Sequence, residues 1–409
     1  RSRQVMDVSN AMFIDFYQIY DLAHSILTSI GIGASAAWMS YFVACVAISL
    51  IIINVLIMST AVYTWFERRV IGRFQVRRGP NRHGPFGILQ PIADVVKLIL
   101  KEDTIPGEAD KPVFTLAPIV LLAPTLLTII VIPLGETSFL GSLNIGILFI
   151  VGVTSVNAIA IFMAGWGSRN KYAILGSMRG AAMLVSYEIP MALGITSVLL
   201  LSGSLAMTEI VKQQSIWFIA VMPMGFFVFM AAATAEMSRT PFDQIEAESE
   251  LGSGYNTEYS GIKFAVLFLA EFMAPIITAA IVTTLFLGGT KGVDPVPGEI
   301  WFVSKMFVVI FILLWFRATW PRLRVDQIMG FAWKPLFGLG IANIFIIAIE
   351  RQILSDSSGT LSSEDLLIMS AVNWVVTIAT ILILANVFGR KKFERPEPVP
   401  SPLANMGGD

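Results

Sequence analysis

Long runs of apolar residues recur along this chain, and they restrict its fold more than any other feature. The hydrocarbon core of a bilayer requires roughly 20 predominantly apolar residues in a helix. Nine runs suit this requirement, near residues 39–65, 113–133, 144–165, 178–201, 215–236, 261–287, 301–319, 336–353 and 366–388. The sequence therefore predicts an all-α polytopic membrane protein, built as a bundle of about nine transmembrane helices.

The composition agrees with this class and argues against several functions. Of the 409 residues, 55% are apolar and only 14% are charged, whereas soluble domains carry roughly 25% charged residues. A net charge of −1 without a basic tail gives no reason to expect nucleic-acid binding. One cysteine, Cys45, and two histidines, His24 and His83, are too few for an iron–sulfur, zinc or haem site. We therefore expect no cofactor on this chain and expect partner chains to do any redox chemistry.

Lysine and arginine predict the orientation, because cytoplasmic loops carry an excess of both. If the loop of residues 67–111 is cytoplasmic, 22 of the 28 Lys and Arg residues lie on that side. The amino end is then outside and the carboxyl end cytoplasmic. Residues 1–38 lack a signal-peptide pattern and are interpreted as an interfacial segment. The remaining divisions are a transmembrane core (39–354), an additional helix (355–389) and a flexible, Pro-rich tail (390–409).

The loop of residues 67–111 carries nine Lys and Arg between two apolar runs. Its segment RRGPNRHGP, residues 77–85, predicts a tight turn that gathers arginines, which could bind lipid heads, an anionic partner or a polar ligand head. Residues 88–102 place four polar side chains on one helical face, namely Gln90, Asp94, Lys97 and Lys101. This segment is too short to span, so we expect an amphipathic interfacial helix. An ordinary surface helix is the alternative.

A second charged region, residues 235–261, is strongly acidic. Its carboxylates are Glu236, Asp243, Glu246, Glu248, Glu250 and Glu258. If the segment after Pro241 is helical, Asp243, Glu246 and Glu250 share one face. Carboxylates that lie so close raise one another's pKa toward the range of a proton carrier. A solvated acidic loop that contacts a basic partner is the alternative.

Two further carboxylates, Glu188 and Glu271, lie near the middle of apolar runs. An ionised side chain at the bilayer centre costs roughly 2.5 to 3.5 kcal/mol, so both are expected to face the bundle interior. With Glu236 they could extend the acidic loop into a buried series of proton-exchanging groups, unless each is simply neutral and hydrogen-bonded to a neighbouring helix. Arg317 ends another apolar run, where its guanidinium could snorkel to the interface or point into a ligand passage.

Four long motifs resemble one family. They are Glu67-Arg68-Arg69 with RRGPNRHGPFGILQPIADVVKL, NKYAILGSMRGAAMLVSYEIP, AEMSRTPFDQIEAESELGSGYNTEYSG and FRATWPRLRVDQIM. Together they resemble the quinone-tunnel membrane subunit of respiratory complex I, the family of NADH:quinone oxidoreductase subunits designated H. The likeness runs from about Tyr63 to Lys334 in the family's order.

The resemblance implies a subunit without a cofactor that joins the hydrophilic redox arm to the proton-pumping arm in the bacterial cytoplasmic (inner) membrane. Quinone, either ubiquinone or menaquinone, would be the substrate, with FMN and iron–sulfur clusters in partner subunits. The implied partners are phospholipid, the quinone-reducing and iron–sulfur hydrophilic subunits, and neighbouring small and antiporter-like membrane subunits. The family core usually has eight spans, so the run at 366–388 would be an additional helix, as in some bacterial members.

The matched motifs also imply site residues, none of them catalytic or metal-binding. The quinone tunnel and its mouth would involve Glu67, Arg68, Arg77, Asp94 and Arg317. The proton pathway would involve Glu188, Glu236, Asp243, Glu246, Glu248, Glu250 and Glu271. Gln244-Ile245 departs from the Leu-Pro or Leu-Ala of the family but removes no carboxylate.

The resemblance and the residues together suggest a mechanism and leave other classes open. We hypothesise that the loop of residues 237–261, with Gly252 and Gly254 as pivots, changes state when quinone is reduced. A membrane subunit of an ion-pumping hydrogenase or another relative not driven by NADH would share the acidic loop. An autonomous cation antiporter and a purely structural anchor are the remaining alternatives.

Overall fold

The computed structural model describes residues 16–29, 36–135, 143–245, 252–293, 295–354 and 362–389. Within these ranges, eight helices are long and apolar enough to cross a membrane. The all-α polytopic class predicted from the apolar runs is therefore confirmed. Five of the spanning segments are single helices: α2 (Ala36–Phe74), α7 (Lys171–Ser202), α12 (Gly261–Phe286), α13 (Gly298–Thr319) and α16 (Ser363–Gly389). The other three are made of consecutive helices: α4 (Lys111–Thr128) with η3 (Ile129–Val131); α5 (Gly146–Thr154) with α6 (Val156–Gly167); and α14 (Val325–Phe331) with η5 (Ala332–Leu336) and α15 (Phe337–Leu354).

Shorter helices complete the described fold. They are α1 (Phe16–Ser29), η2 (Pro85–Gly87), α3 (Gln90–Leu100), α8 (Met207–Gln213), α9 (Phe218–Val221), α10 (Pro223–Glu236) and η4 (Gly254–Asn256). Helix α3 lies inside the predicted amphipathic segment of residues 88–102, and most of its residues are partly or fully exposed. The expected tail of residues 390–409 lies outside the described residues.

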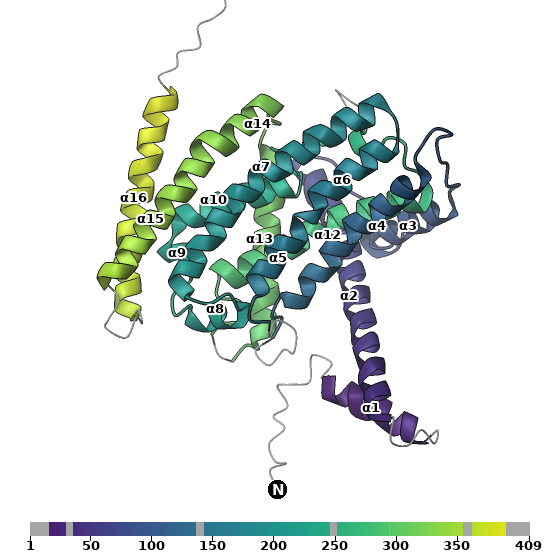
Figure 1. The fold of residues 1–409 in the computed structure, drawn as a ribbon, viewed down its shortest axis with the longest axis horizontal. Coiled ribbons are helices and arrows are strands. Elements are labelled where there is room, and N and C mark those ends of the chain that lie inside the picture. The colour runs from purple at the N-terminus through teal and green to yellow at the C-terminus, as the bar shows by residue number, and fades with distance from the viewer. Residues whose placement is uncertain are drawn as a thin grey trace, which may run out of the picture.

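Helix α7 lies at the centre of the bundle, where α6, α10 and α15 pack against it (Figure 1). Helices α4 and α12 pack against each other beside this centre. Helix α2 leaves the bundle toward α1, while α15 and α16 form the opposite edge in Figure 1. The large apolar side chains that remain exposed, such as Phe42 on α2, Val303 on α13 and Val375 on α16, suit helices whose outer faces contact hydrocarbon.

The run at residues 215–236 differs from its prediction as one span. It forms α9 and α10, with Met222 between them at φ −132° and ψ 69°. Pro223 follows directly, and proline both lacks an amide hydrogen and clashes with the carbonyl four residues earlier. The ninth apolar helix, α10, therefore has 14 residues and is shorter than the eight that meet the length of a span.

The helices alternate in direction, so the chain segments gather at two ends of the bundle. At one end, Lys263 pairs with Asp103 at 2.9 Å, and Arg317 pairs with Glu67. We call this the charged end. At the opposite end, the Ile147 amide donates to the Leu205 carbonyl at 3.2 Å. The charged end is the one predicted to face the cytoplasm.

Candidate functional site

Four charged side chains from distant parts of the chain meet at the charged end of the bundle. Glu67 lies on α2, Arg239 follows α10, Glu271 lies on α12 and Arg317 lies on α13. We call them the four-charge cluster. Arg317 pairs with Glu67 Oε1, and an Arg239 nitrogen lies 3.7 Å from the same oxygen. The other terminal nitrogen of Arg239 lies 3.3 Å from Glu271 Oε1, so two cations balance two carboxylates.

The balance of charge explains how this cluster can be buried. The side chains of Glu67 and Arg239 are only 4% and 9% exposed, and an ion that deep requires a partner of opposite charge. The guanidinium of Arg239 also lies 4.6 Å from the centre of the Phe272 ring, which is a favourable cation–π position. Glu67 Oε2 has no hydrogen-bond partner among the described residues. The cluster is thus paired but incompletely hydrogen-bonded.

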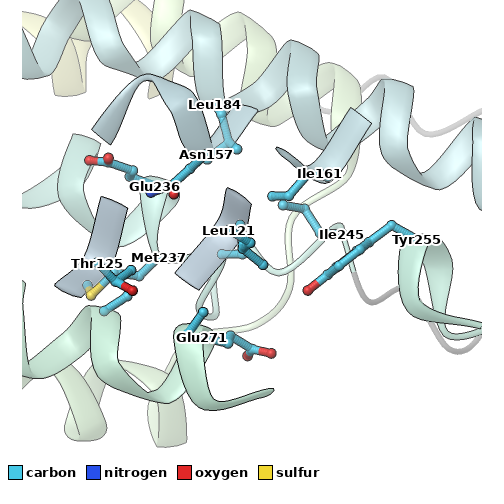
Figure 2. A pocket seen from close by; sticks show the side chains of 13 residues that line it. Leu121, Thr125, Asn157, Ile161, Leu184, Glu236, Met237, Ile245, Tyr255 and Glu271 are labelled. Carbon is cyan, nitrogen blue, oxygen red and sulfur yellow. The ribbon is translucent and has the colours of Figure 1, made fainter. Parts of the chain in front are cut away.

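A cavity of about 60 Å³ extends from the four-charge cluster into the bundle. Glu271 and Glu236 both line it, and Figure 2 shows them at different walls of the cavity. A second cavity of about 60 Å³ is also lined by Glu236. Asn157 lines both cavities, and its buried Oδ1 has no hydrogen-bond partner in the described structure. Both spaces are large enough for water, and the polar lining suits it.

Glu188 adds a further carboxylate next to this region. It lies on α7, is half-buried, and interacts electrostatically with Glu236. The structure thus brings Glu271, Glu236 and Glu188 into one region, with a cavity between the first two and electrostatic contact between the last two.

The other predicted tunnel residues form a separate group near the surface. Arg68 pairs with Asp94 at 2.6 Å, and the Gln90 side-chain amide donates to the other oxygen of Asp94 at 3.1 Å. This contact fastens α3 to α2. Arg77 is exposed and donates to the Gln75 side chain at 2.6 Å. Glu67 and Arg317 therefore meet, Arg68 and Asp94 form a second pair, and Arg77 lies apart from both.

The acidic loop is described only in part. Asp243 is half-buried, whereas Glu246, Glu248 and Glu250 lie outside the described residues. The start of the loop is anchored to the segment after α13 by two hydrogen bonds. The side-chain amide of Gln244 donates to the Leu323 carbonyl, and the backbone amide of Leu323 donates to the Pro241 carbonyl at 3.1 Å. Gln244, the departure from the family pattern, thus has a structural contact.

Arg239 is the member of the four-charge cluster that the sequence did not predict as a site residue, because it belongs to the many cations assigned to the cytoplasmic side. Its position three residues after Glu236 does not indicate that its side chain contacts α2 and α12. A usable signal was the need for a counter-ion, since Glu67 and Glu271 are two carboxylates and Arg317 is one cation. The structure supplies the second cation from Arg239.

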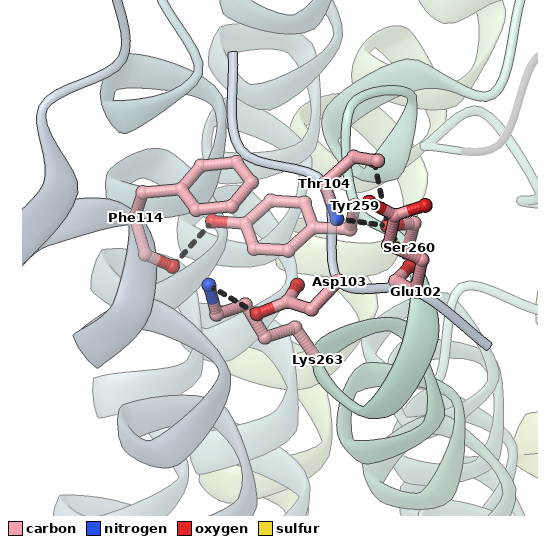
Figure 3. A network of polar contacts seen from close by, with 7 residues as sticks. All are labelled: Glu102, Asp103, Thr104, Phe114, Tyr259, Ser260 and Lys263. Carbon is pink, nitrogen blue, oxygen red and sulfur yellow. Dashed lines mark hydrogen bonds and ion pairs between the residues drawn. The ribbon is translucent and has the colours of Figure 1, made fainter. Parts of the chain in front are cut away.

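A polar network ties the segment after α3 to the start of α12 (Figure 3). The Thr104 amide donates to the Ser260 hydroxyl at 2.9 Å, and Lys263 pairs with Asp103 at 2.9 Å. The Tyr259 hydroxyl donates to the Phe114 carbonyl at 3.1 Å, and the two rings stack with centres 4.1 Å apart. Burial raises the pKa of Tyr259, so its hydroxyl remains a donor at neutral pH.

Potential cofactor ligands are sparse in the part of the chain that the structure describes. Among those residues, no three His, Cys, Asp or Glu side chains are grouped so that they could hold a metal ion. What the described part of the site offers is paired charges, carboxylates and small polar cavities.

A helical bundle with eight apolar helices of spanning length defines the class as an integral membrane protein. Residues 46–348 match the family model described as NADH dehydrogenase. The chain is 49% identical over 340 residues to the NADH-quinone oxidoreductase subunit designated H of Dehalococcoides mccartyi strain CBDB1, covering 83% of this chain and 94% of that protein. It is 44% identical over 325 residues to the subunit of the same name from Bacillus cytotoxicus, covering 78% and 97%.

The chain belongs to the NADH dehydrogenase family, and its relatives identify it as a membrane subunit of NADH-quinone oxidoreductase, respiratory complex I. The resemblance carried by the four motifs is confirmed. A subunit of this kind works within a complex.

Proposed function

We propose that this subunit forms the access passage for quinone together with the quinone-reducing hydrophilic subunit, and that its buried carboxylates couple quinone reduction to proton translocation. The observation that carries the proposal is the four-charge cluster together with the cavity that reaches from Glu271 to Glu236. In this proposal, the arrangement would link the charged end of the bundle electrostatically to the carboxylates beyond the cavity.

The quinone passage would begin at the charged end, beside Glu67 and Arg317. The Phe272 ring lies against the cluster, 4.6 Å from the guanidinium of Arg239, and the Phe268 ring is next to it, with ring centres 4.5 Å apart. Such side chains suit the apolar tail of a quinone, while charged groups orient its polar head or hold the passage walls in place. Arg68, Asp94 and Arg77 would serve the mouth of the passage. Electron transfer would take place in partner subunits that hold FMN and iron–sulfur clusters.

Proton translocation would use the carboxylates that follow the cluster. Because Arg239 contacts both Glu67 and Glu271, a change of charge near Glu67 alters the pairing of Arg239 and therefore the electrostatic environment of Glu271. Protonation changes then propagate through coupled groups to Glu236 and Glu188. Asp243, Glu246, Glu248 and Glu250 would connect this route to the acidic loop.

A passive series of carboxylates would not be sufficient. Moving one elementary charge against 100 mV costs about 2.3 kcal/mol, so a structural element must change state when quinone is reduced. The loop of residues 237–261 is the proposed element, because Arg239 lies at its start and joins the cluster. The neighbouring small and antiporter-like membrane subunits would respond to this change of the loop where they contact the surface of the bundle, which would also bind phospholipid.

The decisive variant is Glu271→Gln, which keeps the size of the side chain but removes its charge from Arg239. In the intact complex in proteoliposomes, we expect NADH oxidation by a hydrophilic artificial acceptor to be normal. Quinone-dependent proton uptake should slow roughly tenfold, the factor that corresponds to about 1.4 kcal/mol.

The matched control is Glu209→Gln, because Glu209 is a partly exposed carboxylate at the opposite end that pairs only with nearby Lys212 at 2.9 Å. This control should leave both rates unchanged. A normal rate of quinone-dependent proton uptake in the Glu271→Gln complex would reject the proposed coupling.

A further inference from the structure

The helix α16 lies beyond residue 348, where the match to the family model ends. Its bundle-facing side carries residues that recur at helical spacing, namely Leu366, Met369, Ser370, Asn373 and Thr380. Leu366, Met369 and Asn373 are almost completely buried. Neighbouring positions such as Val372 and Val375 are exposed. Because lipid is as apolar as leucine, small and polar side chains are what attach one helix to another in a membrane. This stripe is therefore a docking face.

The docking face meets the break between α9 and α10. Helix α16 packs against both α9 and α10, and these two helices are separated by the non-helical conformation of Met222. A break in a membrane helix requires new partners for the backbone groups that it releases. The Ser370 hydroxyl supplies such a partner, since it donates to the carbonyl of Ala220 at 2.8 Å.

A second polar contact fastens α16 to its other neighbour. The side-chain amide of Asn373 donates to Glu350 Oε2 on α15 at 2.8 Å. The other oxygen, Glu350 Oε1, is buried and has no hydrogen-bond partner in the described structure. Asn373 is therefore the side chain that holds this carboxyl, and α16 is attached to α15 and to the α9–α10 break at once.

From these contacts we infer that α16 is a clamp for the break at Met222, that Ser370 is a positioning residue that fixes the start of α10, and that Asn373 fastens α16 to α15. Helix α10 runs from Pro223 to Glu236, and Glu236 lies between the two cavities. Holding one end of so short a helix holds the other. The consequence for proton transfer rests on the proposed function, whereas the clamp itself does not.

The clamp is tested by hydrogen exchange of the intact complex carrying Ser370→Ala. The reporters are the amides of Met222 and Phe226, which flank the break and donate to the carbonyls of Phe218 and Met222 at 2.8 and 3.1 Å. We expect their exchange to accelerate about three- to tenfold, the effect of losing one interhelical hydrogen bond in a membrane. Ser370→Thr keeps the hydroxyl and should restore the original rate.

Thr377→Val is the matched control, because the Thr377 hydroxyl bonds only to the Asn373 carbonyl of its own helix, at 2.6 Å. It should leave the reporters unchanged. Equal exchange in Ser370→Ala and Thr377→Val would overturn the clamp. Faster hydrogen exchange in Ser370→Ala that extends equally to the amides of α12 would also overturn the clamp, because it would indicate that the whole bundle is less stable and not that the break is released.

The link to proton transfer has its own readout. In Ser370→Ala, proton uptake per electron should fall by about half or more if one lost hydrogen bond releases α10, and Ser370→Thr should recover it. Faster exchange at the break with unchanged proton uptake would overturn the positioning of Glu236. That result differs from failure of the proposed function, which is judged by Glu271→Gln alone.

Discussion

Glu67 shows at the level of single residues how this bundle tolerates charge. Its carboxylate is almost fully buried, and two arginines from separate helical regions approach the same oxygen. Removing one partner of a buried pair is much more harmful than replacing both, because it leaves an uncompensated charge in a poorly polar environment. The two arginines are nevertheless unequal, since Arg317 is in direct contact and Arg239 is shared with Glu271.

Arg317→Met should therefore destabilise the charged end by about 3 kcal/mol, at the lower end of the range for a broken buried pair because Arg239 remains nearby. Arg317→Lys should retain most of the stability. The measurement is the temperature at which the purified complex loses quinone reductase activity. Arg322→Met, which changes an exposed arginine just beyond α13, is the control. A similar loss in both methionine variants would contradict the assigned pairing.

Some candidate site residues can be predicted from the sequence because the free-energy cost of burying their charge is evident from the neighbouring residues in the chain. Glu188 and Glu271 stood out because a carboxylate within an apolar run must face the bundle interior, and the matched motifs pointed to Glu67 and Arg317. The position of Arg239 between Glu67 and Glu271 could not be predicted in the same way. It depends on α2, α12 and α13 meeting one loop, and those contacts join residues far apart in the chain.

At the level of helices, residues 252–256 are held against α7 by a close approach of the two backbones. A Cβ placed on Gly176 of α7 would lie 2.9 Å from the Cα of Gly254 and 3.1 Å from its carbonyl carbon. These are backbone atoms that cannot rotate away. Gly254 has φ of +67° and Gly252 has φ of +69°, a conformation that favours glycine. Gly252 has open space around it, so it is the freer of the two proposed pivots.

Gly176→Ala should destabilise the packing of residues 252–256 on α7 by about 1–3 kcal/mol, as overpacking does, although alanine is the better helix former. Gly338→Ala on α15 is the control, since a Cβ there meets nothing within 4 Å. Limited proteolysis of the complex measures the difference. We expect faster cleavage near Tyr255 only in Gly176→Ala. Identical cleavage in the two variants would show that this close approach does not hold the loop.

Helix existence was predictable from the apolar runs, but helix continuity was not. The run at residues 215–236 has the composition of one span, and only the local effect of Pro223 divides it into α9 and α10. Conversely, α2 continues to Phe74, well past the apolar run that ends near residue 65. Helical residues beyond the hydrocarbon need no apolar side chains, so hydropathy marks the membrane-embedded part of a helix and not its end.

At the scale of the whole molecule, the few Lys and Arg side chains at the end opposite the charged end include two that bind backbone carbonyls. The Lys305 ammonium donates to the carbonyls of Leu287, Gly289 and Lys291 after α12, at 2.8, 3.0 and 2.5 Å. Arg351 donates to the Leu200 carbonyl near the end of α7. Cations stabilise the carbonyl ends of helices. These residues therefore serve local structure, and the excess at the charged end remains the signal for topology.

The orientation can be tested with single cysteines in a background where Cys45 is replaced by serine. Val293 lies at the end opposite the charged end and is 71% exposed, and Arg169 is exposed between α6 and α7 at the charged end. Because 22 of the 28 Lys and Arg residues belong to the side predicted as cytoplasmic, a membrane-impermeant maleimide should label Val293→Cys in wall-stripped cells. Arg169→Cys should react only in inverted vesicles. The reverse pattern would place the charged end outside, where the hydrophilic redox arm could not receive electrons from cytoplasmic NADH, and the proposed quinone passage would fail with it.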